Sequence, residues 1–470
     1  MTYKTTVGIE VHAELKTKSK MFCGCKNDPH AAEPNTLICP VCLAHPGTLP
    51  TVNKEAVRKV LEVGVALNGE LADYSEFDRK NYFYPDIPKA YQLSQLANPF
   101  VTGGELAGVK ITRVHLEEDT ARSLHDKGEG SIVDFNRAGV PLMELVTEPV
   151  IHDSKSAGDF TRELQLLLRT LGVSDANMER GEMRVEANIS VSSTDELGTK
   201  VEVKNLNSFK AMEQAIDFEV KRHIAMIEKG EEISQETRGW DENRSKTFSQ
   251  RSKETADDYR YFPDPDIPKF KLSEIEDFDK SRIEENMVEL PDKIRLSLQE
   301  FEVKSEQIET LLADAGLLNF LKESIRFSCN SSRGVQLAAN YLTSDISGLL
   351  QADEAGELKT ANAEVFAALV SMVESGEITS RVAKDLLKEV VFEGADPKNI
   401  AKERGLLQTS STDDILPVVK DLIANNPTVV EEYKAGKETA IKFLVGQGMK
   451  ETKGSANPAI LLQILQDELS

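Results

Sequence analysis

The sequence predicts an α+β protein: an N-terminal, mainly antiparallel β cradle domain with helices, followed by an all-α helical domain and a small helical tail domain. Stretches in which apolar and polar residues alternate strictly, typical of half-buried strands, occur before residue 293. Later residues follow one amphipathic helical pattern after another, interrupted by a polar, turn-rich run at 405–414. We therefore predict domains at 1–293, 294–405 and 406–470.

Two alternating stretches define the predicted sheet. VGIEVHAEL places apolar side chains on one face and Glu10, His12 and Glu14 on the other, because side chains alternate along a strand. MRVEANISV does the same with Arg184 and Glu186 on its polar face, and a polar break separates it from TKVEVKNL. The latter two stretches predict an antiparallel hairpin with one buried and one polar face.

Capping residues place the helices. Asn53 is the expected N-cap of KEAVRKVLEVGVAL, and GDFTRELQLLLRTLG carries one apolar helical stripe that ends at a glycine. Ser208 is the expected N-cap of a helix that closes at Gly230, and Thr379 or Ser380 begins one of the later helices.

Composition excludes several classes of protein. Hydrophobic residues make up 40% and charged residues 29%, as in an ordinary globular protein rather than a disordered one. We expect no membrane segment and no signal peptide, because no apolar run approaches about 18 residues and the first 20 residues carry charges throughout. A net charge of −23 repels phosphate, so a general nucleic-acid coat protein is disfavoured, whereas local basic patches remain compatible with RNA.

Four of the five cysteines form a cluster, in which C-x-C and C-x-x-C are separated by a loop rich in glycine, proline and asparagine. Two close pairs suit a tetrahedral zinc ion, and four thiolates leave no open position, so the site would be structural. Two reduced pairs that only pack, or a redox pair, are the alternatives. Free thiols favour a cytoplasmic protein. The cluster comprises Cys23, Cys25, Cys39 and Cys42, whereas Cys329 is interpreted as a packing residue.

Neither nucleotide-binding glycine motif is present, so any use of ATP requires another architecture. The candidate chemistry is a set of carboxylates with one imidazole on alternating strands, a ligand set that suits Mg²⁺. Solvated carboxylates on strand faces are the alternative. The set comprises Glu10, His12, Glu144, Glu186 and the run Glu117, Glu118 and Asp119 at the end of ITRVHLEED.

Two segments combine cations, aromatic rings and proline turns. FDRKNYFYPDIPKAYQLSQ offers Arg79 and Lys80 beside an aromatic run, and DDYRYFPDPDIPKF repeats the arrangement around Arg260. Loops of this kind can present Arg and Lys to phosphates. They can also simply plug a core, and that alternative stays open.

These segments, together with HLEEDTARS, DFNRAGVPLMELVTEP, RVEANIS, EVKNLNSFKAME, QETRGWDE and the C-terminal AIKFLVGQGMKETKGSANP, resemble in order the B subunit of the tRNA-dependent amidotransferase. The resemblance covers nearly the whole chain. It implies a heterotrimer in which a glutaminase A subunit, accompanied by a small C subunit, supplies ammonia. The B subunit would use ATP and Mg²⁺ to phosphorylate the side-chain carboxylate of misacylated Glu-tRNA(Gln) and/or Asp-tRNA(Asn), and ammonia would then displace phosphate.

The resemblance also implies roles for individual residues. The implied magnesium ligands are Glu10, His12, Glu118, Glu144 and Glu186. The implied catalytic residues are Lys80, Arg79, Glu144 and Arg184, of which Lys80, Arg79 and Arg184 would also contact ATP. The cysteine cluster would hold a stabilising zinc ion.

The tail carries five lysines between Tyr433 and Gly454 against two glutamates, and the resemblance favours this patch as a tRNA contact over a merely solvated helix face. The lysines are Lys434, Lys437, Lys442, Lys450 and Lys453. Two rival functions remain open: a zinc-stabilised RNA-binding module without catalysis, and a docking platform for a partner that holds the active site.

Overall fold

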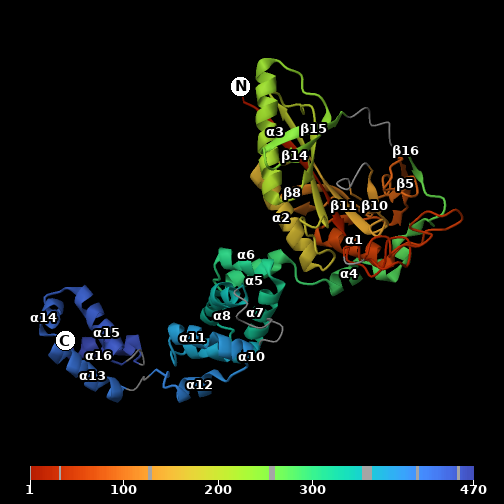
Figure 1. Cartoon of the computed structure of the whole chain (residues 1–470). Coiled ribbons are helices and arrows are strands. Elements are labelled where there is room, and N and C mark those ends of the chain that lie inside the picture. Colours follow the sequence, from red (N-terminus) through yellow and green to blue (C-terminus); the bar gives the residue numbers. More distant parts are fainter. Residues whose placement is uncertain are drawn as a thin grey trace. The chain divides into compact units, whose positions relative to one another are not determined.

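The computed structural model describes residues 2–30, 33–124, 130–252, 260–351, 362–408, 412–452 and 456–469. The chain divides into two compact units, Met1–Pro291 and Asp292–Ser470 (Figure 1). The first unit is built on a large, mostly antiparallel sheet and the second is helical, which confirms the predicted fold class. A further division of the second unit at residue 405 stays a prediction.

The main sheet has the strand order β15-β14-β13-β12-β1-β11-β8-β6-β2, with β7 paired to β8 off this path. The predicted hairpin is confirmed as the antiparallel pair β12 and β13, and among the described strands only β13 and β14 run parallel. The central strand β1 pairs with β11 on one side and β12 on the other. The strands are β1 (Lys4–Glu14), β2 (Glu70–Leu71), β6 (Val101–Thr102), β7 (Glu105–Leu106), β8 (Val109–Glu118), β11 (Pro141–Thr147), β12 (Met183–Ser192), β13 (Val201–Leu206), β14 (Glu236–Asp241) and β15 (Lys246–Ser252).

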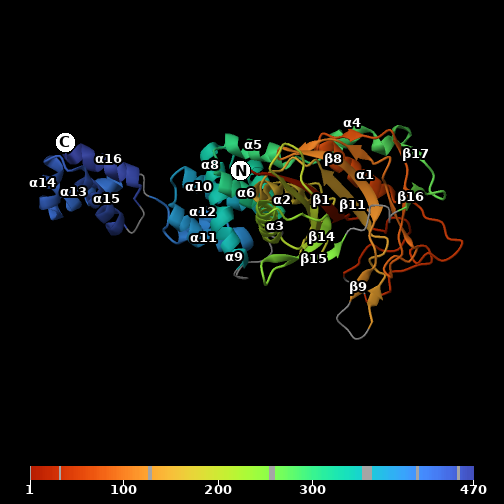
Figure 2. The same ribbon diagram turned by 90° about the horizontal axis from the view of Figure 1, so that it is seen from above.

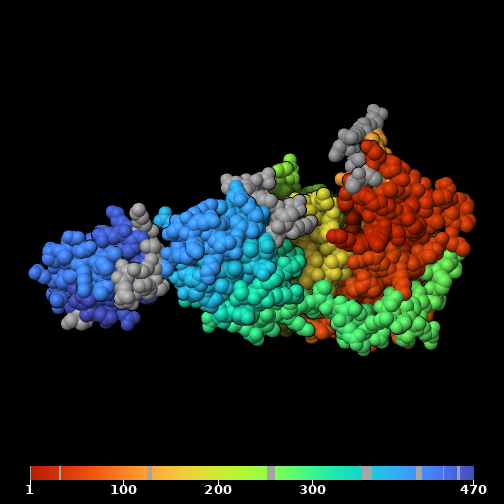
Figure 3. Space-filling model, turned by 90° about the horizontal axis from the view of Figure 1, so that it is seen from below, coloured from red at the N-terminus to blue at the C-terminus, as the bar shows by residue number. Residues whose placement is uncertain are grey.

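Three small sheets complete the described part of the first unit. One of them joins the two aromatic segments, because β16 (Arg260–Pro263) pairs with β4 (Asp78–Asn81), which pairs in turn with β5 (Tyr91–Ser94). Figure 3 shows the chain around residues 270–290, in green, lying against the first hundred residues, in red. The other two sheets pair β9 (Arg122–Leu124) with β10 (Ile132–Asp134), and β17 (Phe270–Lys271) with β3 (Tyr74–Ser75).

One face of the main sheet is apolar and packs against helices. Val7, Ile9, Val11 and Ala13 of β1 are at most 1% exposed, and burying each larger side chain contributes roughly 1.5–3 kcal/mol. The helices that share this core are α1 (Lys54–Ala66), α2 (Ser154–Thr170), α3 (Phe209–Lys229) and the short α4 (Lys280–Asn286). Figures 1 and 2 show α2 and α3 side by side next to the sheet. The opposite face of β1 is therefore left to its polar residues.

The predicted helix ends are confirmed where the caps are seen. Asn53 accepts hydrogen bonds from the backbone N–H groups of Glu55 and Ala56, and Ser208 accepts one from Ala211. Of the two alternatives for the later helix, Thr379 is the N-cap, and Ser380 is the first residue inside the helix. Gly230 ends α3 with φ of 72°, a left-handed conformation that glycine adopts without steric cost.

The second unit is all helical, and none of the helices in the described part of the chain is long and apolar enough to cross a membrane. Its helices are α5 (Pro291–Glu300), α6 (Ser305–Ala313), α7 (Ala315–Phe327), α8 (Ser332–Asn340), α9 (Ser347–Gln351), α10 (Ala363–Glu374), α11 (Ser380–Phe392), α12 (Pro397–Glu403), α13 (Thr412–Asn425), α14 (Pro427–Lys434), α15 (Glu438–Glu451) and α16 (Pro458–Leu469). Cys329, after α7, is fully buried.

A buried carboxylate ties α3 to the far end of the main sheet. Glu219 of α3 is fully buried, accepts hydrogen bonds from Arg222 at 2.7 Å and from Thr247 of β15, and lies 3.2 Å from Arg238 of β14. Burial alone would raise the pKa of Glu219, but bonds from His223, Arg222 and Thr247 lower it to about 2. Glu219 is therefore ionised in the folded protein at neutral pH.

We expect Glu219→Gln to lower the free energy of unfolding at neutral pH by about 3 kcal/mol, because the folded pKa of about 2 lies below the unfolded value of about 4.3. When folding lowers a carboxyl pKa, the resulting stability is fully present at pH values above the pKa of the unfolded state. It is lost as the pH falls through the pKa of the folded state. The difference between wild type and variant should thus shrink between pH 4 and pH 2. Urea unfolding followed by the fluorescence of Trp240, the single tryptophan, reports on this region. An equal difference at pH 7 and pH 2.5 would contradict the assignment.

Candidate active site

The polar face of the central strands brings charged residues into one row. His12 of β1 lies opposite Glu144 of β11 and opposite Arg184 of β12, and Glu144 lies opposite His115 of β8. Residues in register on neighbouring antiparallel strands have side chains about 5 Å apart at their Cβ atoms. The row therefore places the carboxylate of Glu144 between two imidazoles, with an arginine beyond His12.

Distances within the row show a compact cluster. The Nε2 atom of His12 is 3.2 Å from Glu144 Oε2 and 3.5 Å from Glu117 Oε1. The Nε2 atom of His115 is 3.3 Å from Glu144 Oε2. Glu117 joins the cluster because it follows His115 by two residues and so shares its face. The side chains of His115 and Glu117 are only 3% exposed, so these groups interact with little screening by water.

The pKa values of His12 and Glu144 are shifted in opposite directions. Burial alone would lower the pKa of His12, but the carboxylates of Glu117 and Glu144 raise it well above its usual value. Burial would likewise raise the pKa of Glu144, yet the imidazoles of His115 and His12 hold it well below the usual value. The two residues thus favour the charged pair, imidazolium with carboxylate.

A second acidic group adjoins the cluster on the side of β12. Glu10 lies opposite Glu186, and Lys204 of β13 places its Nζ atom 2.8 Å from a Glu186 carboxylate oxygen and 3.7 Å from Glu202. Burial, followed by the charges of Glu144 and Glu186, raises the pKa of Glu10 to about 7. Glu10 is therefore partly protonated near neutral pH.

These residues fit a divalent cation. Ligand atoms of Glu10, His12 and Glu144 lie within 4.8 Å of one another, as do those of His115, Glu117 and Glu144 and those of Glu10, Glu186 and Glu202. Glu117 Oε2 is buried and has no hydrogen-bond partner among the described residues, a costly state that a bound cation would relieve. The carboxylate oxygens, which are the majority of these ligand atoms, suit a hard ion such as Mg²⁺.

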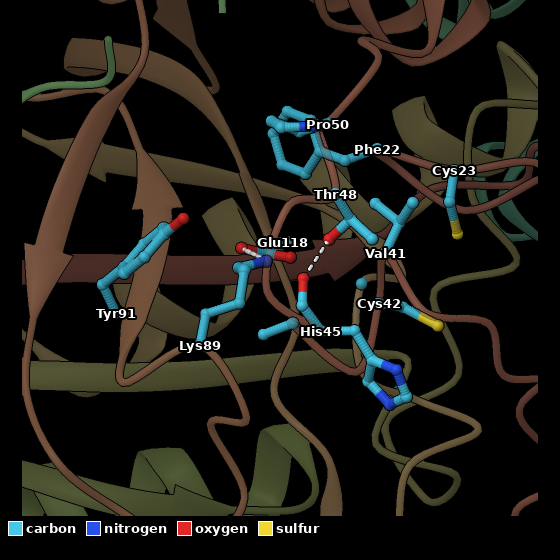
Figure 4. Close-up of a pocket in the computed structure, with 12 residues that line it drawn as sticks. Phe22, Cys23, Val41, Cys42, His45, Thr48, Pro50, Lys89, Tyr91 and Glu118 are labelled. Carbon is cyan, nitrogen blue, oxygen red and sulfur yellow. Dashed lines mark hydrogen bonds and ion pairs between the residues drawn. The ribbon is translucent and has the colours of Figure 1, made fainter. Parts of the chain in front are cut away.

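The structure does not bring Glu118 into this cluster, because adjacent residues of a strand point to opposite faces. Its carboxylate accepts a hydrogen bond from the backbone N–H of Leu93 at 3.0 Å and pairs with Lys89. Figure 4 shows Lys89 and Glu118 pointing toward each other in a cavity of about 170 Å³ that Phe22 and Cys42 also line. Glu117 thus replaces Glu118 as the cluster's carboxylate from β8.

His115 was missed as a candidate, although the sequence carried the signal that would find it. In ITRVHLEED the alternation places Arg113, His115 and Glu117 on one face and Leu116 and Glu118 on the other. Once β8 is known to adjoin β11, this face continues the polar face of β1.

Lys80 and Arg79 point in different directions from β4. Burial alone would lower the pKa of Lys80, but electrostatic interactions with Glu117, Tyr261 and Glu144 raise it, as expected for an ammonium near the carboxylates of the cluster. Lys80 also lies opposite Tyr261 in the pairing of β4 with β16.

Arg79 pairs with two carboxylates of the protein, and its contact with phosphate stays a prediction. Its Nε donates to Asp264 at 2.6 Å and its Nη2 donates to Asp266 at 2.9 Å, and its guanidinium lies 4.4 Å from the centre of the Tyr91 ring. The side chain of Asp264 is fully buried. Arg79 therefore fastens the second aromatic segment to the first and so fixes the strand that carries Lys80.

Arg184 lies in the row opposite His12, and its guanidinium contacts the buried carboxylate of Asp119 at the end of the sheet. Its Nη2 donates to Asp119 at 2.9 Å, and Arg137 lies 3.8 Å from the same carboxylate. Burial would raise the pKa of Asp119, but Arg184 and Arg137 lower it. Arg184 is thus held beside His12 by an anion of the protein.

Comparison with known proteins decides the family. The GatB/GatE catalytic domain model matches residues 5–276, and the GatB domain model matches residues 325–469. The chain belongs to the family of B subunits of the aspartyl/glutamyl-tRNA(Asn/Gln) amidotransferase.

Relatives match this chain along its whole length. It is 42% identical to the B subunit of the aspartyl/glutamyl-tRNA(Asn/Gln) amidotransferase from Caldicellulosiruptor saccharolyticus, covering 100% of this chain and 99% of the relative. The proteins of the same name from Caldanaerobacter subterraneus and Persephonella marina are 41% and 40% identical, each covering 100% of both chains. The predicted family is confirmed.

In this family member the four clustered cysteines lie within 4.8 Å of one another and could hold a metal such as zinc. A tetrahedral ion with Zn–S bonds of about 2.3 Å separates its sulfur ligands by about 3.8 Å, and Cys39 Sγ and Cys42 Sγ are 3.8 Å apart. A hydrogen bond from the Cys23 thiol lowers the pKa of Cys42 to about 5, whereas burial raises that of Cys25 to about 11. The set therefore offers one ready thiolate and three further sulfur ligands.

The lysines of the tail are exposed where they are described. Lys434 ends α14, Lys442 and Lys450 lie on α15, and Lys437 pairs with Glu432 at 2.8 Å. Lys453 lies outside the described residues. The role of these lysines in binding tRNA stays a prediction.

We expect Arg79→Ala to destabilise the first unit by about 2 kcal/mol, because it removes two charge-assisted hydrogen bonds and leaves Asp264 buried without its cation. Amide hydrogen exchange in β16 should rise, since this strand is fastened through Asp264. Arg282→Ala, which removes an exposed arginine of α4, is the control. Unchanged exchange in β16 would show that strand pairing alone holds the segment.

Proposed function

We propose that this protein acts within a heterotrimeric tRNA-dependent amidotransferase, where it phosphorylates the side-chain carboxylate of Glu-tRNA(Gln) and/or Asp-tRNA(Asn). Ammonia, supplied by a glutaminase A subunit with a small C subunit alongside, then displaces phosphate and leaves the amide. The observation that carries the proposal is the buried cluster of His12, His115, Glu117 and Glu144. One of its carboxylate oxygens, Glu117 Oε2, has no hydrogen-bond partner among the described residues. The reaction belongs in the cytoplasm, where the tRNA is charged.

The chemistry explains why such a cluster is needed. A carboxylate is a poor acyl donor because an oxide would have to leave, whereas an acyl phosphate has a good leaving group. Transfer of a phosphoryl group from ATP to an acid brings two anions together, and catalysis consists mainly of positioning them and offsetting their charge. No serine or cysteine nucleophile is required.

The residues divide this work. Mg²⁺ would be held by Glu10, His12, Glu117 and Glu144. The neighbouring side chains of Glu186 and His115 would lie next to these ligands. When bound, the ion supplies positive charge to the phosphates. Lys80, held beside Glu117 and Glu144, contributes a cation to the transferred phosphoryl group. Arg184 orients the His12 side of the site, and Arg79 acts on Lys80 through the pairing of β4 with β16.

The cysteine cluster and the tail lysines would support the same function without taking part in the chemical step. We assign zinc to the four cysteines as a structural ion, because four sulfur ligands leave no position for a substrate. The tail lysines would contact tRNA phosphates, which a chain of −23 cannot bind over a wide surface.

We expect Glu117→Gln to lower ATP-dependent amidation by the assembled enzyme at least about 100-fold, because it removes a buried anionic ligand. Glu105→Gln, at the exposed position of β7 next to β8, is the matched control and should retain activity. A tRNA-binding module without catalysis, or a platform for a partner's active site, predicts full turnover in both variants.

Lys80→Ala should abolish ATP hydrolysis that depends on Mg²⁺ and misacylated tRNA, since it removes the cation that we assign to the transferred phosphoryl group. Lys80→Arg should recover part of it, because the positive charge is kept. The rate of ADP formation measures both variants. Normal ADP formation by Lys80→Ala would exclude this lysine from the reaction.

Metal analysis of the purified chain should find about one zinc per molecule. Cys39→Ser should lower both the zinc content and the stability of the loop that carries the cluster, whereas Cys329→Ser should leave the zinc content unchanged. Less than a tenth of an equivalent in the wild-type chain would contradict the assignment.

A further inference from the structure

A basic cavity of about 210 Å³ lies at the end of the sheet where β1 and β8 finish and β11 and β12 begin. Three arginines line it, together with His30 and Asn207, and Glu179 is its one carboxylate among the described residues. The arginines are Arg122, Arg137 and Arg180. In a chain with 23 more acidic than basic residues, a cavity with this excess of guanidinium groups points to an anionic ligand.

Arg137 is fixed in place and still has hydrogen-bonding capacity. Its Nε donates to the carbonyl of Thr120 and its Nη2 to that of Ala121, both at 3.0 Å. These two bonds orient the guanidinium plane and leave Nη1 without a partner among the described residues. A planar group held this way can donate to a phosphate with little loss of conformational entropy.

Two further arginines adjoin this fixed group from separate segments. Arg122 lies on β9 and is exposed, and Arg180 lies in the turn before β12 with its Nη1 3.6 Å from Glu182. His30 is held near Glu14 at 3.7 Å and Glu182 at 3.9 Å. Segments far apart in the sequence thus converge on one cavity.

The helix that begins at this cavity adds to its positive potential. Asn207 lines the cavity and immediately precedes Ser208, the N-cap of the 21-residue helix α3. The N-terminus of a helix carries a partial positive charge. The motif EVKNLNSFKAME, which the proposed reaction does not otherwise use, supplies this junction.

One buried carboxylate connects the cavity to the active site. Asp119 lies 3.8 Å from Arg137, which lines the cavity, and 2.9 Å from Arg184, which lies opposite His12. A ligand bound to Arg137 would therefore be connected to the cluster through Asp119 and Arg184. The cluster's own carboxylates repel a polyanion, so an RNA end that delivers its aminoacyl group there needs cations close by.

We propose that this cavity binds a phosphate of the sugar–phosphate backbone at the 3′ end of the aminoacylated RNA substrate and so positions the aminoacyl group at the cluster. The inference rests on the proposed function for the identity of the RNA. A nucleotide phosphate has the same chemistry, and the experiment separates the two sources.

The test measures binding of two RNA probes to the assembled enzyme without ATP. One probe is a full-length tRNA(Gln) transcript and the other is the same transcript without its three 3′-terminal nucleotides. Arg122→Gln combined with Arg180→Gln should weaken binding of the full transcript about fivefold and that of the shortened one less than twofold, and should reduce the salt dependence by about one phosphate contact. The KM for ATP should not change.

The matched control is Arg244→Gln combined with Arg282→Gln, which removes two exposed arginines elsewhere in the first unit. It should bind both transcripts like wild type. Arg137→Lys, which keeps the charge but loses the planar donor geometry, should reproduce part of the loss for the full transcript alone.

Equal weakening for both transcripts would overturn the proposal in favour of general electrostatic attraction. A raised KM for ATP with unchanged RNA binding would overturn it in favour of a nucleotide site. Failure of the proposed function is separate, because it appears as full turnover in Glu117→Gln and leaves the RNA-binding comparison unaffected.

Discussion

The pairing of β1 with β11 and β12 is the constraint on which the rest of the site depends. Alternation along β1 sends Val7, Ile9 and Val11 into a helix-covered core, and it sends Glu10 and His12 to the opposite face. A shift of register by one residue would exchange the two faces, burying carboxylates under α2 and α3 and exposing the core. The apolar face therefore holds the charged face in place, and the stability of the core secures the geometry of the cluster.

The charged face gains its properties from the same arrangement. Neighbouring strands bring His12 and His115 within hydrogen-bonding reach of Glu144, while the surrounding strands limit access of water. Burial alone would drive His12 and Glu144 toward their neutral forms, but together the two groups favour imidazolium with carboxylate. A divalent ion bound here must displace that proton, because an imidazole ligand is neutral. The cluster is thus a balanced set of charges before any ligand binds.

Net charge constrains where RNA binds rather than whether it binds. The carboxylates of the cluster contribute to the excess of acid and suit a cation with phosphates attached. Arginines are gathered instead at the end of the sheet, around Arg137, and exposed lysines of the tail, such as Lys434 and Lys442, lie on α14 and α15. An acidic protein that separates its charges this way can attract a polyanion at chosen points and repel it elsewhere.

The sequence by itself determined the local features: the two faces of β1 and β12, the hairpin, and the caps Asn53 and Ser208, because each follows from alternation or from a neighbouring N–H group. It also determined the family, through long motifs in order. Only the tertiary structure shows that Glu117, and not Glu118, lies in the cluster. The two side chains point to opposite faces of β8, and the pairing of β8 with β11 determines which of these faces adjoins Glu144. It alone turned Arg79 toward Asp264, a partner 185 residues away, and it alone gathered the arginines of the basic cavity. Contacts between distant segments carry no periodicity, so the folded chain is what establishes them.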